Sequence, residues 1–542
     1  MTFMKILSAT EMQTCDHVTT EQFGIPSIDL MRNAANSVAT FVREHFPQAH
    51  RITILCGRGN NGGDGLMTAR LLIESGLEAT TLLLGEPEGL KGDAAQAWSE
   101  LKAVPNAPIT IITTAEELPQ HVAILKADLI LDAVLGTGFK PPLRGLPLEA
   151  LAWLKSQPSL PSMLAIDLPS GWDADSTEAT AENAYPADAV VTFTAPKPAH
   201  VFGQLTRSIR QPIVVAPIGS PDEAIVSSLN LHWSGAAKSI TDRERPADSN
   251  KGMFGHVLVI GGSTGKSGAP AMASLAALRT GAGLVTAAVA PSVLPLVAAI
   301  APELMTQALA TTPAGEISTD NLAPESLKAL LHRMTVLAIG PGLSTTPEAI
   351  EFVMGLLSES RLPAVVDADG LNALATQIDR LPAIAANRTL VLTPHPGEMA
   401  RLTGLDTKQV QADRIRIARD FAARNQVILV LKGWRTLIAH PDGSVAINTT
   451  GNPGMAKGGS GDLLTGMVAG LLAQHPSDPK RAVEAAVYLH GLAADITVQT
   501  DAIGGSQHTL LATDSLANLY KAFRFHPQAD SGYCWLQGLP VE

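Results

Sequence analysis

The sequence is poor in cysteine, in aromatic residues and in positive charge, and these shortages exclude several classes of protein. Three cysteines in 542 residues, far apart at Cys15, Cys56 and Cys534, form neither a disulfide framework nor a zinc site. They indicate a reducing compartment, so we expect a cytoplasmic protein. Lysine and arginine number 39 against 51 acidic residues, which gives a net charge of −12. We expect no nucleic acid as a partner, because binding it requires a positive surface that displaces counterions from phosphates.

Long apolar segments are also scarce, and we expect no membrane association. One uncharged stretch, residues 280–302, is about long enough to span a bilayer. It is interrupted by Gly281, Gly283, Pro291, Pro295 and Pro302. These residues favour a buried strand, a turn and a short helix over a membrane span.

Glycine, proline and short apolar runs are abundant instead. The 46 glycines and 37 prolines suit many tight connections between strands and helices. In the first part of the chain, apolar runs occupy residues 51–56, 80–84, 109–114, 127–136, 163–171, 187–195 and 212–216. Runs without alternation are typical of strands buried on both faces, and helix-period stretches between them predict a parallel sheet.

The same pattern restarts after a polar, turn-rich segment at residues 219–250, which marks a linker or an edge excursion. Further apolar runs occupy residues 256–262, 284–290, 335–342, 363–370, 389–397 and 427–433. A Pro-Asp-Gly turn between residues 436–440 and 443–447 predicts a hairpin, and two helices are predicted near 462–474 and 481–498. We therefore predict two α/β domains, at residues 1–220 and 238–525. The tail after 525 shows no interpretable pattern.

A glycine-rich loop follows the first strand and reads GRGNNGGDG, residues 57–65. Its glycines fit the pattern G-x-G-x-x-G, whose open backbone approaches a pyrophosphate at a helix N-terminus. That pattern alone is equally met by a tight structural turn. Asn60, Asn61 and Asp64 are more informative, because they add amide and carboxylate oxygens that an ordinary dinucleotide loop does not need.

Two more strand ends of the first domain carry polar side chains. Asp132 ends one predicted strand, and Asp167 ends another, with Ser170 three residues on. Because the carboxyl ends of parallel strands meet in one crevice, these side chains can share a site with Asn61. A strand-end aspartate can also be a helix cap. The two aspartates together, beside the asparagine-rich loop, favour a functional site.

In the second domain the strongest signal is GNPGMAKGGSGD, residues 451–462. Gly458, Gly459 and Gly461 free backbone N–H groups before a helix predicted to begin at Asp462. Such a loop makes an anion hole with a carboxylate beside it, which phosphoryl transfer requires. A plain loop with an N-cap aspartate is the alternative.

Three other strand ends of this domain carry polar residues. Lys432 and Gly433 are plausible contacts for nucleotide phosphates, and His395 lies between two prolines that stiffen its backbone. The histidine is either a ligand contact or a packed turn residue. Asp367 and Asp369 are either close to a magnesium ion or hold loops, and the sequence leaves both alternatives open.

The first-domain motifs GxGNNGGDG, DAxxGTG and IDxPSG, in this order, resemble the NAD(P)H-hydrate epimerase domain of the YjeF N-terminal type. The resemblance implies a Rossmann-like αβα domain with a parallel sheet, and a K⁺ ion held by Asn61, Asp132 and Ser170. It implies substrate contacts from Asn60, Asn61, Gly62, Gly63, Asp64, Gly136, Thr137, Gly138, Phe139, Lys140, Pro141, Pro142 and Asp167. Inversion at C6 of the hydrated nicotinamide needs a general acid or base, for which Asp167 is the first candidate and Lys140 the second.

Residues 238–522 resemble the ADP-dependent NAD(P)H-hydrate dehydratases, through NKGxFGHVLVIGGS, GAGLVT, IGPGL, DADGLN, TPHPGEMARL, LKG and GNxGMAxGGSGD. The implied fold is ribokinase-like. The implied contacts to the hydrated cofactor are Ala273, Gly342, His395 and Asp462, and Asp462 is the implied catalytic residue. ADP would enter with Mg²⁺. The implied contacts to ADP are Lys432, Gly433, Trp434, Arg435, Thr436 and Gly461. Relatives often read Lys-Gly-Ala-Gly-Thr where this chain has Lys-Gly-Trp-Arg-Thr, residues 432–436.

Together the two resemblances imply an enzyme that repairs hydrated NADH and NADPH. The first domain would interconvert the R and S epimers, and the second would dehydrate the S epimer with ADP, giving AMP and phosphate. We expect small-molecule substrates and a homo-oligomer. The alternatives are a ribokinase-like kinase for a vitamin precursor or sugar, a non-catalytic nucleotide-binding protein, and a dehydrogenase. For the dehydrogenase, Glu86 is the nearest candidate for the required acidic residue.

Overall fold

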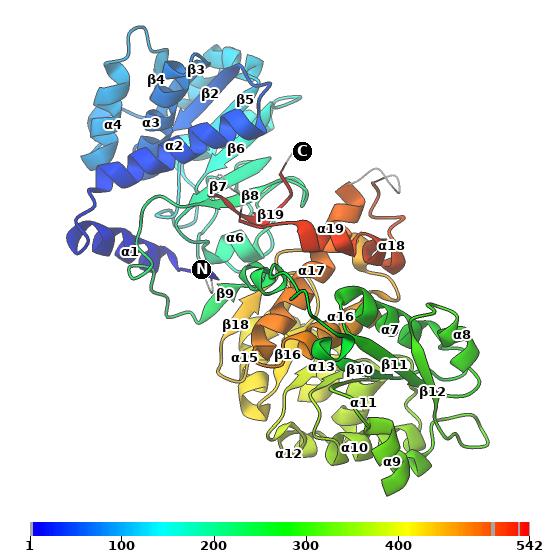
Figure 1. Cartoon of the computed structure of the whole chain (residues 1–542). Helices are drawn as coiled ribbons and strands as arrows, with labels where there is room; N and C mark the ends of the chain where they lie inside the picture. Colours follow the sequence, from blue (N-terminus) through cyan, green and yellow to red (C-terminus); the bar gives the residue numbers. More distant parts are fainter. Residues whose placement is uncertain (1–3, 500–504, 529–531, 541–542) are drawn as a thin grey trace. The chain divides into compact units, whose positions relative to one another are not determined.

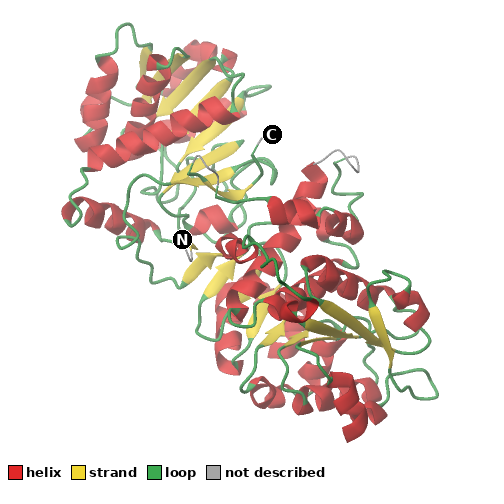
Figure 2. Cartoon of the chain, in the orientation of Figure 1, coloured by secondary structure: helices red, strands yellow, loops and turns green. Residues whose placement is uncertain are grey.

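The computed structural model describes residues 4–499, 505–528 and 532–540, and the chain divides into two compact units. The N-terminal unit comprises Lys5–Leu229 together with the described residues from His526 onward. The C-terminal unit comprises Met4 and Asn230–Phe525. Each unit has a largely parallel sheet with helices packed on it (Figure 1; Figure 2). The predicted class, two α/β domains with parallel sheets, is confirmed.

The sheet of the N-terminal unit has the order β19-β8-β7-β6-β5-β2-β3-β4. Its strands are β2 (Arg51–Cys56), β3 (Glu78–Leu84), β4 (Ile109–Ile112), β5 (Leu129–Ala133), β6 (Ser162–Ile166), β7 (Ala189–Phe193), β8 (Ile213–Ala216) and β19 (Cys534–Gln537). The helices are α1 (Ala9–Glu21), α2 (Ser27–His45), α3 (Asn60–Glu74), α4 (Gly92–Lys102), α5 (Gly145–Lys155) and α6 (Pro198–Phe202). Strands β2 to β8 pair in parallel, as the unalternated apolar runs predict.

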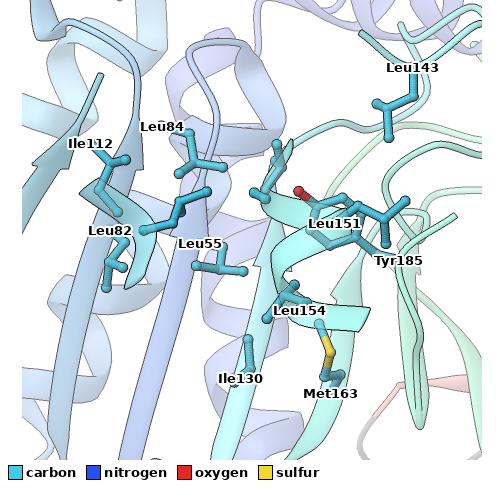
Figure 3. Packing of buried hydrophobic residues seen from close by; sticks show 13 residues of the cluster. Leu55, Leu82, Leu84, Ile112, Ile130, Leu143, Leu151, Leu154, Met163 and Tyr185 are labelled. Atoms are coloured by element: carbon cyan, nitrogen blue, oxygen red, sulfur yellow. The ribbon is translucent and has the colours of Figure 1, made fainter. Parts of the chain in front are cut away.

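The two faces of this sheet are covered by different helices. On one face α3 packs so closely that a Cβ at Gly65 would lie 2.5 Å from the Ala133 side chain and 2.9 Å from Cys56 Sγ. On the opposite face, Leu55, Ile130 and Leu82 belong to an apolar cluster that includes Leu151 and Leu154 of α5 (Figure 3). Burial on both faces explains why the strands lack a polar alternation.

The strand β19 lies in the tail that showed no pattern in the sequence. It pairs antiparallel with β8, where Trp535 is the partner of Val214. The Tyr533 hydroxyl donates to the Ser37 carbonyl at 2.6 Å, and Gln537 donates to Thr206. The tail therefore completes the sheet of the N-terminal unit, although it is separated from the other strands by more than 300 residues.

The sheet of the C-terminal unit has the order β1-β9-β18-β17-β16-β15-β14-β13-β10-β11-β12. Its strands are β1 (Met4–Lys5), β9 (Leu231–Trp233), β10 (His256–Ile260), β11 (Leu284–Val289), β12 (Met305–Ala308), β13 (Val336–Ile339), β14 (Ala364–Val366), β15 (Leu390–Leu392), β16 (Ile428–Leu431), β17 (Leu437–Ala439) and β18 (Val445–Ile447). The predicted hairpin of β17 and β18 is present and antiparallel.

Helices cover this second sheet and position its glycine-rich loops. They are α7 (Gly268–Thr280), α8 (Leu294–Ala298), α9 (Pro324–Leu331), α10 (Pro347–Glu359), α11 (Asp369–Thr376), α12 (Leu381–Ala385), α13 (Pro396–Thr403), α14 (Thr407–Ala412), α15 (Arg414–Asn425), α16 (Ser460–Gln474), α17 (Pro479–Gln499), α18 (Ala512–Ala517) and α19 (Leu519–Arg524). A Cβ at Gly466 of α16 would lie 2.0 Å from the Ala273 carbonyl oxygen of α7. This glycine is therefore required for the close approach of the two helices.

Two sequence expectations concern the segments around these elements. Residues 280–302 contain β11 and α8, as predicted, and no helix within the described ranges is long and apolar enough to cross a membrane. The segment 219–250, expected as a linker or edge excursion, contains β9. Three residues are too short a run to stand out in a sequence, and β9 is held by its parallel pairing with β18.

Beside β9, two histidines converge on one buried glutamate of α17. His232 Nε2 and His440 Nε2 lie 2.9 and 2.8 Å from Glu484 Oε1. All three side chains are buried, and their nitrogen and oxygen atoms lie within 4.8 Å of one another. Both separations are hydrogen-bond distances, so each ring can donate an Nε2–H to the same carboxylate oxygen. The cluster ties β9 and the end of β17 to α17.

We expect Glu484→Ala to lower the free energy of unfolding of the C-terminal unit by about 2–4 kcal/mol. The change leaves two buried ring N–H groups without their acceptor, and an unsatisfied buried donor costs about 1–3 kcal/mol. Urea denaturation followed by far-UV circular dichroism measures it. The control is Glu351→Ala on the exposed side of α10. Equal stability of the two variants would show that the cluster does not hold α17.

Candidate active sites

The N-terminal unit has a pocket of about 1010 Å³ at the carboxyl ends of its central strands. Its wall includes the residues after β2, β5 and β6 that the sequence predicts to converge. Among the lining residues are Asn60, Asn61, Asp64, Gly136, Thr137, Gly138, Phe139 and Asp167. The structure thus brings the three predicted loops together. Within the described part of the chain, Gly62, Gly63, Lys140, Pro141 and Pro142 do not line the pocket.

The glycines of the first loop have a packing role. A Cβ at Gly62 would lie 1.9 Å from the Gly57 carbonyl oxygen, and a Cβ at Gly57 would lie 2.0 Å from the Val134 carbonyl oxygen. Gly59 is the N-cap of α3, and its backbone is extended. These contacts press the loop onto the end of β5 and aim the first turn of α3 at the pocket.

Asp167 is the most heavily bonded side chain of the pocket. Its Oδ1 accepts from Lys197 Nζ at 3.0 Å and from Thr192 Oγ1 at 2.9 Å. Its Oδ2 accepts from the backbone N–H of Thr137 at 2.7 Å and from the Thr137 hydroxyl. The Asp167 backbone has φ 67°, a left-handed conformation that costs energy for a non-glycine residue. His200 offsets this cost, because its Nε2 lies 2.7 Å from the Asp167 carbonyl oxygen.

The charges around Asp167 fix its protonation state. Burial alone would raise its pKa, but the charge of Lys197 and the hydrogen bonds from Thr137 outweigh burial, so the pKa lies well below its usual range. Burial and the same lysine lower the pKa of His200 to about 4. A neutral His200 accepts at Nδ1 from the Lys197 backbone N–H at 3.0 Å and donates at Nε2 to the Asp167 carbonyl. Asp167 is therefore a permanent anion in a rigid frame.

Asp132 and Ser170 form a second, fully buried group. Asp132 Oδ1 accepts from Ser170 Oγ at 2.6 Å, and its Oδ2 accepts from the Ser170 backbone N–H at 2.8 Å. The Ser170 hydroxyl also lies 3.2 Å from the Leu135 carbonyl oxygen. Gly136 follows directly, and a Cβ there would lie 3.0 Å from both Asn61 Cγ and Asp167 Oδ2. Asn61 is buried, and neither Oδ1 nor Nδ2 has a hydrogen-bond partner among the described residues.

Sequence reasoning missed several pocket residues. Asp16 of α1, Asp93 of α4 and Lys197 line the pocket, and His200 supports it. None of them belongs to a motif, so no local pattern marks them. Lys140, the second acid–base candidate, is largely exposed and lies 2.9 Å from Asp173 and 2.7 Å from Asp175.

In the C-terminal unit, the predicted residues of the glycine-rich loop lie at the start of α16. Gly459 is the N-cap with φ 95°, and Asp462 lies in the first helical turn. The helix begins at Ser460, two residues before the predicted start. A Cβ at Gly461 would lie 3.5 Å from Lys432 Nζ and 3.7 Å from Asp367 Oδ2. The loop, Lys432 and Asp367 therefore form one site.

Lys432 is held in place by two carboxylates. Its Nζ lies 2.8 Å from Asp367 Oδ1 and 3.8 Å from Glu398 Oε2. Thr465 Oγ1 of α16 donates to Asp367 Oδ2 at 2.7 Å. Burial alone would lower the pKa of Lys432, but the two carboxylates raise it, so the ammonium stays charged. A fixed positive charge thus lies beside the helix N-terminus, where both attract an anion.

Asp462 has the electrostatics of a general base. Burial, together with the negative charge of Asp367, raises its pKa to about 6, although Lys432 opposes this rise. A carboxylate with such a pKa is ionised near neutral pH and still accepts a proton more readily than an ordinary aspartate. The first turn of a helix normally stabilises an ionised aspartate. At Asp462, burial and the charge of Asp367 outweigh that stabilisation.

The other residues of this unit that the sequence predicts to contact the substrate lie outside the cluster at the start of α16. His395 is the exposed N-cap of α13, where its Nδ1 accepts from the Gly397 N–H at 3.0 Å. Gly342 has φ 66° and faces Lys266, whose ammonium reaches Asp369 at 3.2 Å. Ala273 is fully buried in the contact between α7 and α16. The structure does not bring Ala273 to the surface of the site.

Residues 432–436 do not form an open loop of the kind that binds phosphate. Gly433 has φ 140°, a backbone conformation that favours glycine. Arg435 is buried, and its Nη1 donates to the Thr449 carbonyl at 2.5 Å. Trp434 is 38% exposed and stacks against the Arg435 guanidinium, whose carbon lies 4.3 Å from the ring centroid. The Arg435 side chain therefore turns inward, whereas the Trp434 indole stays at the surface and the Thr436 hydroxyl donates to the Gly433 carbonyl.

Two family models match the chain and together span most of both units. Residues 27–199 match the YjeF-related protein N-terminus, and residues 257–516 match NAD(P)H-hydrate dehydratase. A bifunctional NAD(P)H-hydrate repair enzyme of Moorella thermoacetica is 42% identical over 501 residues, covering 91% of this chain and 92% of its own. The chain belongs to the family of bifunctional NAD(P)H-hydrate repair enzymes. This confirms the resemblance predicted from the motifs.

Other members of the repair-enzyme family give the same result. The bifunctional repair enzyme of Coxiella burnetii is 38% identical, with 92% of this chain and 95% of that protein covered. That of Escherichia coli is 34% identical, with 95% and 93% covered. Among solved structures, an ADP/ATP-dependent NAD(P)H-hydrate dehydratase from Bacillus subtilis is 34% identical, with a TM-score of 0.44, covering 54% of this chain and 96% of that one. The vitamin or sugar kinase alternative is not favoured.

Proposed function

We propose that the C-terminal unit dehydrates the S epimer of hydrated NADH or NADPH with ADP, giving AMP and phosphate, and that the N-terminal unit interconverts the R and S epimers. Family membership supports both activities. The observation that carries the first is the juxtaposition of Asp462, the open helix N-terminus and the fixed ammonium of Lys432. The pocket around Asp167 supports the second.

Dehydration needs the poor leaving group hydroxide to be converted into a good one. Asp462 takes the proton of the C6 hydroxyl, whose oxygen attacks the β-phosphorus of ADP as the bond to AMP breaks. Backbone N–H groups at the start of α16, with Lys432, stabilise the charge on the transferring group. Phosphate then leaves C6 with its bonding electron pair, C5 releases a proton to water, and the C5–C6 double bond forms.

Magnesium enters this proposal as part of the nucleotide complex. Asp367 is bonded to Lys432 and Thr465, and Asp369 is bonded to Lys266 and the Ser344 N–H. Neither carboxylate offers the free oxygens of a dedicated magnesium site. These two carboxylates are therefore not assigned as Mg²⁺ ligands.

We propose that a potassium ion is held by Asn61, Asp132 and Ser170, which lie at or just after the carboxyl ends of the parallel strands β2, β5 and β6. The group offers oxygens with a single negative charge, and Asn61 Oδ1 is buried without a partner among the described residues. Hard oxygen ligands of low total charge suit a monovalent cation. When bound, the ion would supply a fixed positive charge beside the substrate.

Replacing K⁺ by Na⁺ is expected to lower epimerisation, and Asn61→Leu is expected to raise the K⁺ concentration for half-maximal activity by about tenfold or more. The variant loses one neutral oxygen of the proposed site. A K⁺-dependent rise in Tm should weaken in parallel, because an ion that binds the folded state stabilises it. An epimerase rate and a Tm that are both indifferent to K⁺ would contradict the ion site.

The chemistry of the C-terminal unit is tested by product analysis. With purified S epimer and ADP, we expect one inorganic phosphate and one AMP for each reduced nicotinamide formed. A stable phosphorylated product would indicate the kinase alternative.

A further inference from the structure

The pocket of the N-terminal unit is lined by a further carboxylate, Asp16, besides Asp167. Asp16 lies on α1 one turn after Met12, and both residues line the pocket. The helix is anchored at its start, where Ser8 and Glu11 form a capping box and the Ala9 N–H donates to Asp175. Asp16 is therefore held in the pocket wall by helix α1, whose start is anchored.

The Asp16 side chain lacks the partners that a structural aspartate would have. No described residue donates a hydrogen bond to either carboxylate oxygen of Asp16, and Oδ1 is also buried. An unpaired buried carboxylate oxygen costs free energy, and folded proteins satisfy nearly all such atoms. A carboxylate kept in this state at a pocket wall is best explained by a ligand that supplies the missing partner.

Asp167, the first acid–base candidate, is in the opposite situation. Both of its oxygens accept hydrogen bonds from Lys197, Thr192 and Thr137. A carboxylate saturated with donors is a weak base, because every bond favours its ionised form. Asp167 is suited to hold the Thr137 loop at the pocket wall, whereas Asp16 has a free oxygen for a proton.

We propose that Asp16 is the acid–base group of epimerisation, exchanging a proton with the C6 hydroxyl of the hydrated nicotinamide. This inference rests on the epimerase function proposed above. The Asp16 carboxylate takes the hydroxyl proton, the C6–N1 bond breaks, and its electron pair moves to N1, which is conjugated through C2–C3 to the carboxamide. C6 becomes an aldehyde. Rotation about C5–C6 presents the other face, N1 attacks C6, and Asp16 returns the proton to the oxygen.

One unpaired carboxylate is sufficient for this route. The oxygen of the substrate stays bonded to C6 throughout, so the group that removes the proton also returns it. No redox partner or second base is needed. Loss of hydroxide followed by attack on the opposite face would instead require proton transfer on both faces of the ring.

The electrostatics of the pocket agree with this role. Burial raises the pKa of Asp16 to about 6; Lys197 lowers it, and Asp167 raises it. Asp64 of α3 also interacts with Asp16, and burial together with the charges of Asp167 and Asp16 raises the pKa of Asp64. Cys15 on the same helix also interacts with Asp16, and its pKa is raised by burial and by Asp16; Asp93 of α4 lines the same pocket and raises the pKa of Asp64.

The test compares Asp16→Asn with the full-length parent protein. Conversion of purified R epimer into S is followed by NMR, and a urea unfolding curve like that of the parent shows that the N-terminal unit of the variant is folded. We expect epimerase kcat to fall at least about 100-fold with little change in KM, the range typical of a lost general base. Asp16→Glu should retain part of the activity.

A pH profile separates catalysis from a structural role. The parent epimerase kcat should fall below an apparent pKa of about 6 as Asp16 is protonated, and this limb should be absent from the residual activity of Asp16→Asn. Glu21→Gln, at the exposed end of the same helix, is the control and should behave like the parent.

The outcomes distinguish this inference from the function on which it rests. Epimerase activity of Asp16→Asn within a few-fold of the parent, or an unchanged acid limb, would overturn the assignment of Asp16. Absence of epimerisation by the parent protein itself would instead overturn the proposed function of the N-terminal unit.

Discussion

An Asp462→Asn variant should dehydrate the S epimer at least about 1000-fold more slowly than the parent, while its epimerase activity is unchanged. The amide cannot accept the proton of the attacking hydroxyl, and general-base catalysis contributes about 100- to 10,000-fold. The side chain keeps its size and its place in the first turn of α16, so the glycine loop should remain intact. Reduced nicotinamide formation from S epimer and ADP measures the loss.

The pH dependence provides a second readout for the same group. The pKa of Asp462 is raised to about 6 by burial and by Asp367, and the ionised form is the base. Parent kcat should therefore be constant near neutral pH and fall as the pH drops below about 6. Asp379→Asn, an exposed position of the same unit, is the control. An Asp462→Asn enzyme with near-parental kcat would assign the proton transfer to another group.

Asp167→Asn is expected to lower epimerisation by about 100-fold and to destabilise the N-terminal unit by about 3 kcal/mol. Removing one partner of a buried ion pair leaves the other charge uncompensated, which costs about 3–5 kcal/mol. The loop of Thr137, which lines the pocket, loses its anchor at the same time, because Thr137 then faces an amide instead of an anion. Urea unfolding and R-to-S conversion are the two measurements.

The stability effect has a defined pH window. Because the pKa of Asp167 lies below its ordinary value of 3.8 in the folded unit, its ionisation stabilises the protein above that value. The contribution is lost as the pH falls through the lower folded pKa, and it should be absent from Asp167→Asn. Asp29→Asn, which removes an exposed ion pair with Arg32, should leave stability nearly unchanged, because solvent screens such a pair. Equal effects of the two substitutions would contradict the importance of the buried pair.

The strands and the glycine loops were predictable because their information is local. Apolar runs without alternation marked β2 and β10, and the loops after them contain the glycines that close packing requires. The strand β19 was not predictable in the same way. It is four residues long, and it is fixed by pairing with β8 more than 300 residues earlier in the chain.

The same distinction between local sequence information and tertiary packing applies to the pocket residues. Asn61, Asp132 and Asp167 stand at strand ends inside motifs, so their convergence follows from the parallel sheet. Asp16 and Lys197 reach the pocket from elements whose position is set by tertiary packing, and nothing in their neighbouring residues indicates a site. Arg435 shows the converse, since a charged residue inside a predicted nucleotide loop turns inward to the Thr449 carbonyl.

The most direct test of the two-activity account supplies the full-length protein with a mixture of both NADH-hydrate epimers, Mg²⁺ and ADP. The account predicts complete recovery of the near-ultraviolet absorbance of reduced nicotinamide, because the R epimer is continuously converted into S. The same protein carrying Asp167→Asn should convert the S fraction quickly and the remainder about 100-fold more slowly. Recovery by the parent that stops at the S fraction, or no recovery with either ADP or ATP, would contradict the account.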